Sequence, residues 1–305
     1  MIDVMLSYPG PVTYPPTDFE MSQEVFNTLL DVAEREIQCR LTLHADWRKP
    51  PEYLHAAIQR IARKNLHVTA CFYTSLSKDW LQKMLHASGS IALSIQSLAQ
   101  HPLQEIGTIF KQLPLKPPMR VGIFIPLPDP DFEPFQFQPL LDAGLPLQSV
   151  VLAVGWKDCY SGPLPLDKKD YSVWARSLER AITRFTQAGL TTKTACGLPL
   201  CLFTREQLGR LAKQKIRLPI AHCAPNIMIL PDGALRACHR MDLPRPQTLC
   251  ATTDLSLIAA SIEKRLKPFH SLCPHSEQLV CRSAVCGACG CGCLTTIMAS
   301  WQKFG

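Results

Sequence analysis

A regular alternation of short β-rich runs with amphipathic stretches over residues 1–215 constrains the fold most strongly. Strands are expected at 2–8, 40–44, 66–73, 90–97, 119–126, 148–155 and 191–197, and helices at 22–37, 51–65, 77–88, 171–187 and 204–214. Strands separated by helices predict βαβ units and a parallel sheet. We therefore expect an α/β fold, a partial (β/α)6-type barrel, with an open doubly wound sheet as the alternative. In both, a ligand site would lie at the C-terminal ends of the strands.

The pattern changes near residue 218, which suggests two domains, 1–217 and 218–305. After that point helices and strands become sparse, although a helix is expected at 254–264. The stretch PNIMILPDGALRACHR (225–240) predicts a hairpin, because Pro-Asp-Gly favours a tight turn between two short strands.

Cysteines are concentrated at the C-terminal end, where nine of the fourteen fall within the last 83 residues. The first sixteen residues lack a basic segment followed by an apolar one, and no run of eighteen apolar residues occurs, so neither a signal peptide nor a membrane helix is expected. The expected location is the cytoplasm. Clustered cysteines there ligate metal more often than they form disulfides, and those in CGACGCGC are too close in sequence for unstrained disulfide geometry.

Two metals suit such cysteines. A [4Fe–4S] cluster needs four thiolates on flexible backbone, and structural zinc needs four sulfur or nitrogen ligands. The candidate ligands are Cys223, Cys238, Cys273, Cys281, Cys286, Cys289, Cys291 and Cys293. The net charge of +7 comes without a dense basic run, so nucleic acid is not the expected partner, although a zinc-stabilised module that binds it stays open.

The segment CAPNIMILPDGALRAC (223–238) resembles the opening motif of the SPASM or twitch extension of radical S-adenosylmethionine (radical SAM) enzymes. Residues 41–75 resemble the second strand, helix and third strand of the radical SAM barrel, and SIALSIQS (90–97) resembles its fourth strand. The resemblance implies that the C-terminal cysteines hold one or two auxiliary [4Fe–4S] clusters.

Two departures from the family pattern concern its cofactor. The family holds a catalytic cluster with three cysteines after the first strand, but residues 7–21 contain no cysteine. The family's Gly-Gly-Glu-Pro stretch is replaced by HADW (44–47), where the Trp47 indole is expected to obstruct the methionine end of the cofactor. The chain is therefore expected to be a degenerate member without bound S-adenosylmethionine.

The expected function is that of a cluster-binding accessory, substrate-recognition or electron-transfer partner of a radical enzyme, in the setting of peptide modification and away from membranes. The alternative is an enzyme that uses an auxiliary cluster, or His44 and Asp46 as an acid–base pair. A groove for a peptide or partner chain is expected at Trp47, Trp156, Lys157, Asp158 and Tyr160. The remaining cysteines are expected to be buried: Cys39, Cys71, Cys159, Cys196, Cys201 and Cys250.

The ligand assignment predicts that Cys223→Ala or Cys286→Ala removes iron and sulfide and destabilises the C-terminal module, because metal binding contributes folding free energy. Iron and sulfide analysis after anaerobic purification measures the loss. Full iron and sulfide in both variants would show that the assignment is wrong.

Overall fold

The computed structural model describes residues 2–6, 20–36, 39–64, 66–73, 76–88, 90–94, 98–99, 103–112, 120–132, 137–157, 166–195, 198, 200–213, 226–238, 241–243 and 246–267. The chain forms two compact units. Unit 1 comprises Met1–Ile123, Ala143–Leu147 and Pro225–Ile262, and unit 2 comprises Phe124–Asp142, Gln148–Ala224 and Glu263–Gly305. The hairpin thus groups with the N-terminal half of the chain. Residues 214–225 lie outside the described part, so a domain border near 218 stays a prediction.

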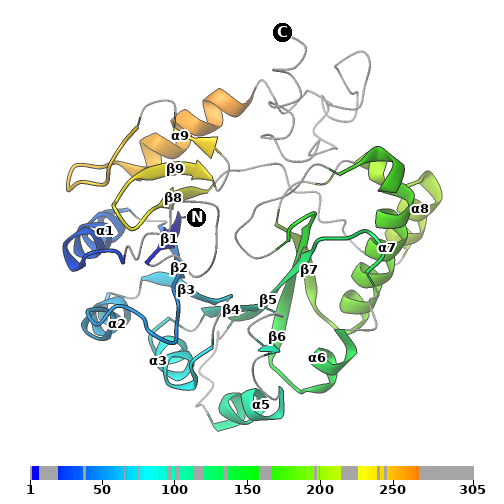
Figure 1. Cartoon of the computed structure of the whole chain (residues 1–305), viewed down its shortest axis with the longest axis horizontal. Helices are drawn as coiled ribbons and strands as arrows, with labels where there is room; N and C mark the ends of the chain where they lie inside the picture. The colour runs from blue at the N-terminus through cyan, green and yellow to red at the C-terminus, as the bar shows by residue number, and fades with distance from the viewer. Residues whose placement is uncertain are drawn as a thin grey trace. The chain divides into compact units, whose positions relative to one another are not determined.

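Unit 1 is an α/β structure whose sheet has the strand order β10-β9-β8-β1-β2-β3-β4. Its strands are β1 (Ile2–Met5), β2 (Arg40–His44), β3 (His67–Phe72), β4 (Ser90–Ser94), β8 (Ile227–Ile229), β9 (Leu235–Cys238) and β10 (Met241–Asp242). Its helices are α1 (Gln23–Arg35), α2 (Leu54–Arg63), α3 (Lys78–Ser88) and α5 (Leu103–Gln112), with α9 (Leu255–Leu266) beginning in this unit. Figure 1 shows α1, α2 and α3 along one side of β1–β4.

The first strand is paired on both sides by parallel neighbours. Ile2 is in register with Leu41 of β2 and with Ile227 of β8, so the sheet joins segments more than 220 residues apart in sequence. β9 then returns antiparallel to β8 through a turn at Gly233, whose φ of 81° favours glycine. The C-terminal hairpin therefore continues the N-terminal parallel sheet (Figure 1).

The two faces of this sheet differ in chemistry, because successive side chains of a strand point to opposite faces. One face, the apolar face, is buried and carries Val4, Leu41, Leu43, Val68, Ala70, Phe72, Ile91, Leu93 and Ile229. It packs against helices whose apolar positions recur at helical spacing, such as Phe26, Leu29, Leu30 and Ala33 of α1. Burial of this face contributes hydrophobic stabilisation to unit 1.

Trp47 belongs to this core, which corrects the expectation that it lines a groove or obstructs a ligand at the strand ends. Its side chain is 0% exposed, stacks on Phe72 at 4.6 Å between ring centroids and lies 5.9 Å from Trp80 of α3. The indole Nε1–H donates a hydrogen bond of 2.7 Å to the Cys71 carbonyl. The ring therefore fills the layer between sheet and helix.

Unit 2 contains the parallel strands β6 (Leu147–Val154) and β7 (Thr191–Thr194). The first residue of β6, Leu147, is assigned to unit 1. Its helices are α6 (Gln138–Asp142), α7 (Tyr171–Gln187) and α8 (Arg205–Lys213), with short 3-10 turns at Lys168–Asp170 and Leu200–Leu202. β5 (Arg120–Leu127) crosses the border between the units. Trp156 is buried edge-on against Phe124 in this unit, so it too is a core residue and not the expected groove contact.

The expected strands and helices of residues 1–215 are all confirmed, as are the two strands of the hairpin and the helix that follows it. The prediction missed α5 and α6, which are short and lie beside proline-rich sequence. Closure of the sheet into a barrel stays a prediction. Among the described residues, no helix is both long and apolar enough to cross a membrane.

The burial of Trp47 predicts that Trp47→Ala lowers the free energy of unfolding by about 3–5 kcal/mol, because it opens a large cavity and removes a buried hydrogen bond. Urea unfolding followed by circular dichroism measures the change. Leu257→Ala is the control, since Leu257 is 68% exposed and its truncation is expected to cost less than about 0.5 kcal/mol. Equal effects of the two substitutions would contradict this account.

Candidate functional site

The second face of the unit 1 sheet, here called the polar face, is the strongest candidate for a functional surface. In register, it carries Thr42, His44, Thr69, Cys71, Tyr73, Ser90, Ser94, Arg236 and Cys238, together with Met5, Ala92 and Met228. Two contacts support this assignment of the face: the Thr69 and Ser90 hydroxyls lie 3.0 Å apart, and the His44 and Tyr73 rings meet edge-on at 5.5 Å.

The polar face is less tightly covered than the apolar one. On the polar face Thr69, Ser90 and Ala92 are half-buried, as are Arg236 and Cys238, whereas the other residues of this face are buried, as Val68, Ile91 and Leu93 of the apolar face are. The accessible part of the polar face is therefore confined to these five positions. A sheet face that is rich in hydroxyl groups and partly accessible is suited to hydrogen-bonding a ligand. An apolar filling would be expected if the face served packing alone.

Cys238 is the one predicted metal ligand within the described residues. It is half-buried at the end of β9, and it alternates with the buried Leu235 and Ala237, so it lies on the polar face with Arg236. A half-buried thiol at the open end of a hairpin fits a cluster ligand. The other seven predicted ligands lie outside the described part: Cys223, Cys273, Cys281, Cys286, Cys289, Cys291 and Cys293.

No group of three or more His, Cys, Asp or Glu side chains that could hold a metal occurs among the described residues. Since only one of the eight predicted ligands is described, the ligand set stays a prediction.

Cys250 lies at the opposite end of the hairpin from Cys238. Leu249 N–H donates to the Gly233 carbonyl at 2.9 Å, which places Cys250 beside the turn. Cys238 is five residues further along the strand, roughly 17 Å away at the usual rise of a β-strand. The two thiols are therefore too far apart to bind one cluster.

The loop that carries Cys250 is fixed by the C-terminal end of α1. Arg35 Nη2 donates to the Ala251 carbonyl at 2.5 Å, and the Glu36 carboxylate accepts from the Ser256 hydroxyl at 2.5 Å at the start of α9. Asp254 caps that helix by accepting from Leu257 N–H at 2.8 Å. Together these contacts join the Cys250 loop and α9 to the first helix of the chain.

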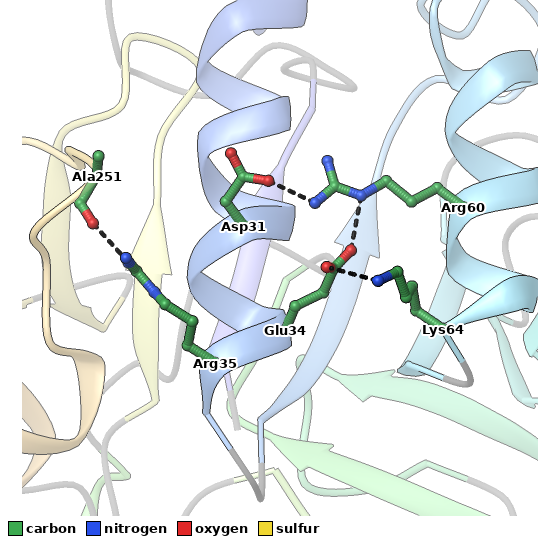
Figure 2. Close-up of polar contacts among 6 residues, drawn as sticks. All are labelled: Asp31, Glu34, Arg35, Arg60, Lys64 and Ala251. Carbon is green, nitrogen blue, oxygen red and sulfur yellow. Dashed lines mark hydrogen bonds and ion pairs between the residues drawn. The ribbon is translucent and has the colours of Figure 1, made fainter.

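Figure 2 shows how α1 is anchored in turn to α2. Arg60 bridges Glu34 at 2.7 Å and Asp31 at 2.5 Å, and Lys64 lies 3.5 Å from Glu34. The hydrogen bond from Arg60 lowers the pKa of Glu34. These side chains are partly exposed, so each pair contributes on the order of 1 kcal/mol or less, and their role is to orient the helices.

Cys250 is exposed, which corrects the expectation that it is buried. Its sulfur lies 3.3 Å from the Thr252 hydroxyl and 3.4 Å from that of Thr253. These hydroxyl groups, with the Thr252 side chain contributing most, stabilise the thiolate and lower the pKa of Cys250 to about 7. Cys39, in contrast, is half-buried, and desolvation raises its pKa to about 11.

The two candidate acid–base residues are differently placed. His44 is 4% exposed at the end of β2 on the polar face. The Asp46 carboxylate accepts hydrogen bonds from Arg48 Nε at 3.0 Å and Arg48 Nη2 at 2.8 Å, and is partly exposed. Catalysis by a His44–Asp46 pair stays a prediction.

The remaining predicted positions differ in their exposure to solvent. Cys71 is buried, as expected, whereas Cys201 is exposed. Lys157 is exposed beside the buried Trp156. Four of the predicted positions fall outside the described residues: Asp158, Cys159, Tyr160 and Cys196.

The lowered pKa predicts that Cys250 is half deprotonated near pH 7 and is alkylated by iodoacetamide with a midpoint there. Replacing both hydroxyl groups, Thr252→Val with Thr253→Val, raises the pKa towards the ordinary value and slows alkylation at pH 7 by roughly tenfold. Peptide mass spectrometry against pH measures this, with Cys39 as an internal thiol that stays protonated over the same range. An unchanged midpoint in the double variant would exclude the hydroxyl groups as the cause.

No protein-family model matches this chain, and no curated protein sequence does. Solved structures do match. SuiB from Streptococcus suis aligns with a TM-score of 0.58 and 12% identity over 98% of this chain and 73% of SuiB. SuiB bound to S-adenosylmethionine aligns with the same score and identity over 98% and 71%. SuiB bound to its precursor peptide SuiA aligns with a TM-score of 0.58 and 11% identity over 98% and 72%.

At this level of identity the matches concern the fold. They show that this chain shares the fold of SuiB.

Proposed function

We propose that this chain is a [4Fe–4S] protein of radical-SAM-like fold that recognises a peptide or a partner radical enzyme and does not cleave S-adenosylmethionine by itself. The observation that carries the recognition role is the half-buried part of the polar face at Thr69, Ser90 and Ala92, which presents two hydroxyl groups. SuiB, which has a similar fold, is known in complex with its precursor peptide, and this supports a peptide as the ligand class.

The proposed loss of cofactor chemistry rests on the chain's own sequence. Residues 7–21 supply no thiolate for a catalytic cluster, and the stretch that follows β2 is HADW. With Trp47 buried in the core, obstruction by its indole no longer supports this proposal. The proposed loss of cofactor chemistry therefore rests on the missing thiolates alone. A reducible cluster must bind S-adenosylmethionine before the cofactor can be cleaved.

In this proposal the auxiliary cluster is held by Cys238 with Cys223 and cysteines of the 273–293 segment. When bound, such a cluster can exchange one electron at low potential. Cys238 lies on the polar face, so a chain seated on that face would lie on the same side of the sheet as the cluster ligand.

Anaerobically purified protein is expected to contain iron and sulfide and to form no 5′-deoxyadenosine from S-adenosylmethionine after dithionite reduction. Chromatography coupled to mass spectrometry detects the nucleoside. Its formation by this protein alone would overturn the proposal that the cofactor chemistry is lost, and zinc in place of iron would favour a zinc-stabilised module.

The recognition role predicts that Thr69→Arg, which places a long cation on the polar face, weakens binding to the peptide or radical enzyme that this chain recognises at least tenfold. Asn27→Arg makes the same charge change at an exposed position of α1 and is expected to leave binding unchanged. Binding is measured by interferometry, with iron content and melting temperature recorded for both variants. Equal binding of the two, at equal iron content, would contradict recognition through this face.

A further inference from the structure

Three metal-binding side chains form a row across the first three strands of the sheet. Met5 of β1 is in register with His44 of β2, and His44 is in register with Cys71 of β3. In-register neighbours of parallel strands point to the same face at a spacing of about 4.8 Å. A thioether, an imidazole and a thiol are therefore adjacent on the polar face, at the C-terminal ends of the strands.

Independent contacts support this shared face. The His44 ring meets the ring of Tyr73, which is two residues from Cys71 and so points to the same side. The intervening Phe72 points to the other side, where it stacks on Trp47. The edge-on tyrosine also restricts the orientation of the imidazole.

All three side chains are removed from water: Met5 is 3% exposed, His44 4% and Cys71 0%. Their backbone is held as well. Leu6 N–H donates to the His44 carbonyl at 2.8 Å, and the Trp47 indole donates to the Cys71 carbonyl at 2.7 Å. A ligand that binds here meets donors whose positions are already ordered by folding, which lowers the entropic cost of binding.

The donor types select the ligand. Thiolate and thioether sulfur favour soft metal ions such as Cu(I), and imidazole is a ligand to copper as well. Structural zinc requires four ligands, and a [4Fe–4S] cluster is held by cysteine thiolates, so this row suits neither.

We propose that Met5, His44 and Cys71 form a binding site for a single soft monovalent cation, Cu(I). Binding replaces the Cys71 S–H bond by an S–Cu bond and releases one proton to solvent, with no change in oxidation state. The proposal uses none of the cysteines of the 223–293 segment and does not depend on the proposed accessory function.

The test is a Cu(I) titration of the full-length protein under anaerobic conditions, in competition with bicinchoninate. Cys71→Ser is expected to bind one equivalent less than the wild type. Cys39→Ser removes a half-buried thiol outside the row and is expected to keep every equivalent. His44→Gln weakens the same site at least tenfold, and Met5→Leu weakens it several-fold.

Two results would overturn the proposal. One is a Cys71→Ser protein that binds Cu(I) with the stoichiometry and affinity of the wild type. If that variant does not fold, the same result in His44→Gln overturns the proposal. The other comes from X-ray absorption spectra of the copper-loaded proteins. If the wild type shows no more nitrogen ligation of copper than Cys71→Ser does, His44 is not a ligand and all the copper lies on the other cysteines.

Discussion

Unit 1 depends on the double parallel pairing of β1. This strand has only four residues, yet it pairs with β2 on one side and with β8 on the other. Without it the hairpin would have no sheet to join, since β8 has three residues and its other neighbour is β9. The pairing also decides which hairpin side chains share a face with the N-terminal strands.

Several features of the candidate site follow from this one pairing. It places Cys238 on the same face as His44 and Cys71, and it brings the 250–256 loop within reach of Arg35 and Glu36. The α1–α2 ion pairs add orientation at the periphery (Figure 2). Long-range pairing thus brings together residues whose chemistry is complementary but whose positions in the sequence are far apart.

The contrast between the two faces connects fold with function. The apolar face is covered by helices. Even the large Trp47 indole is buried there, with its N–H hydrogen-bonded to the Cys71 carbonyl. The polar face carries hydroxyl, thiol and imidazole groups beside buried apolar residues such as Met5 and Met228. The half-buried hydroxyl groups of this face and the register of Met5, His44 and Cys71 are the observations on which the proposals made above rest.

The sequence by itself determined the order and type of most elements. Alternation at periods of two and 3.6 residues distinguished strands from helices, and Pro-Asp-Gly located the hairpin turn where Gly233 adopts positive φ. These features are local, so a sequence pattern records them directly. It also indicated Cys238 at the end of the hairpin, because motif spacing is local too.

Only the tertiary structure decided the environments of individual side chains. Trp47 and Trp156, expected at a binding surface, are buried, because each follows a strand end at a point where the chain turns back into the core. Cys250 is exposed because contacts from Arg35 and Glu36, more than 210 residues away, hold its loop on the surface. The row of Met5, His44 and Cys71 exists only through strand register. Burial and register depend on which segments pair across the whole chain, and that information is not contained in any local pattern of residues.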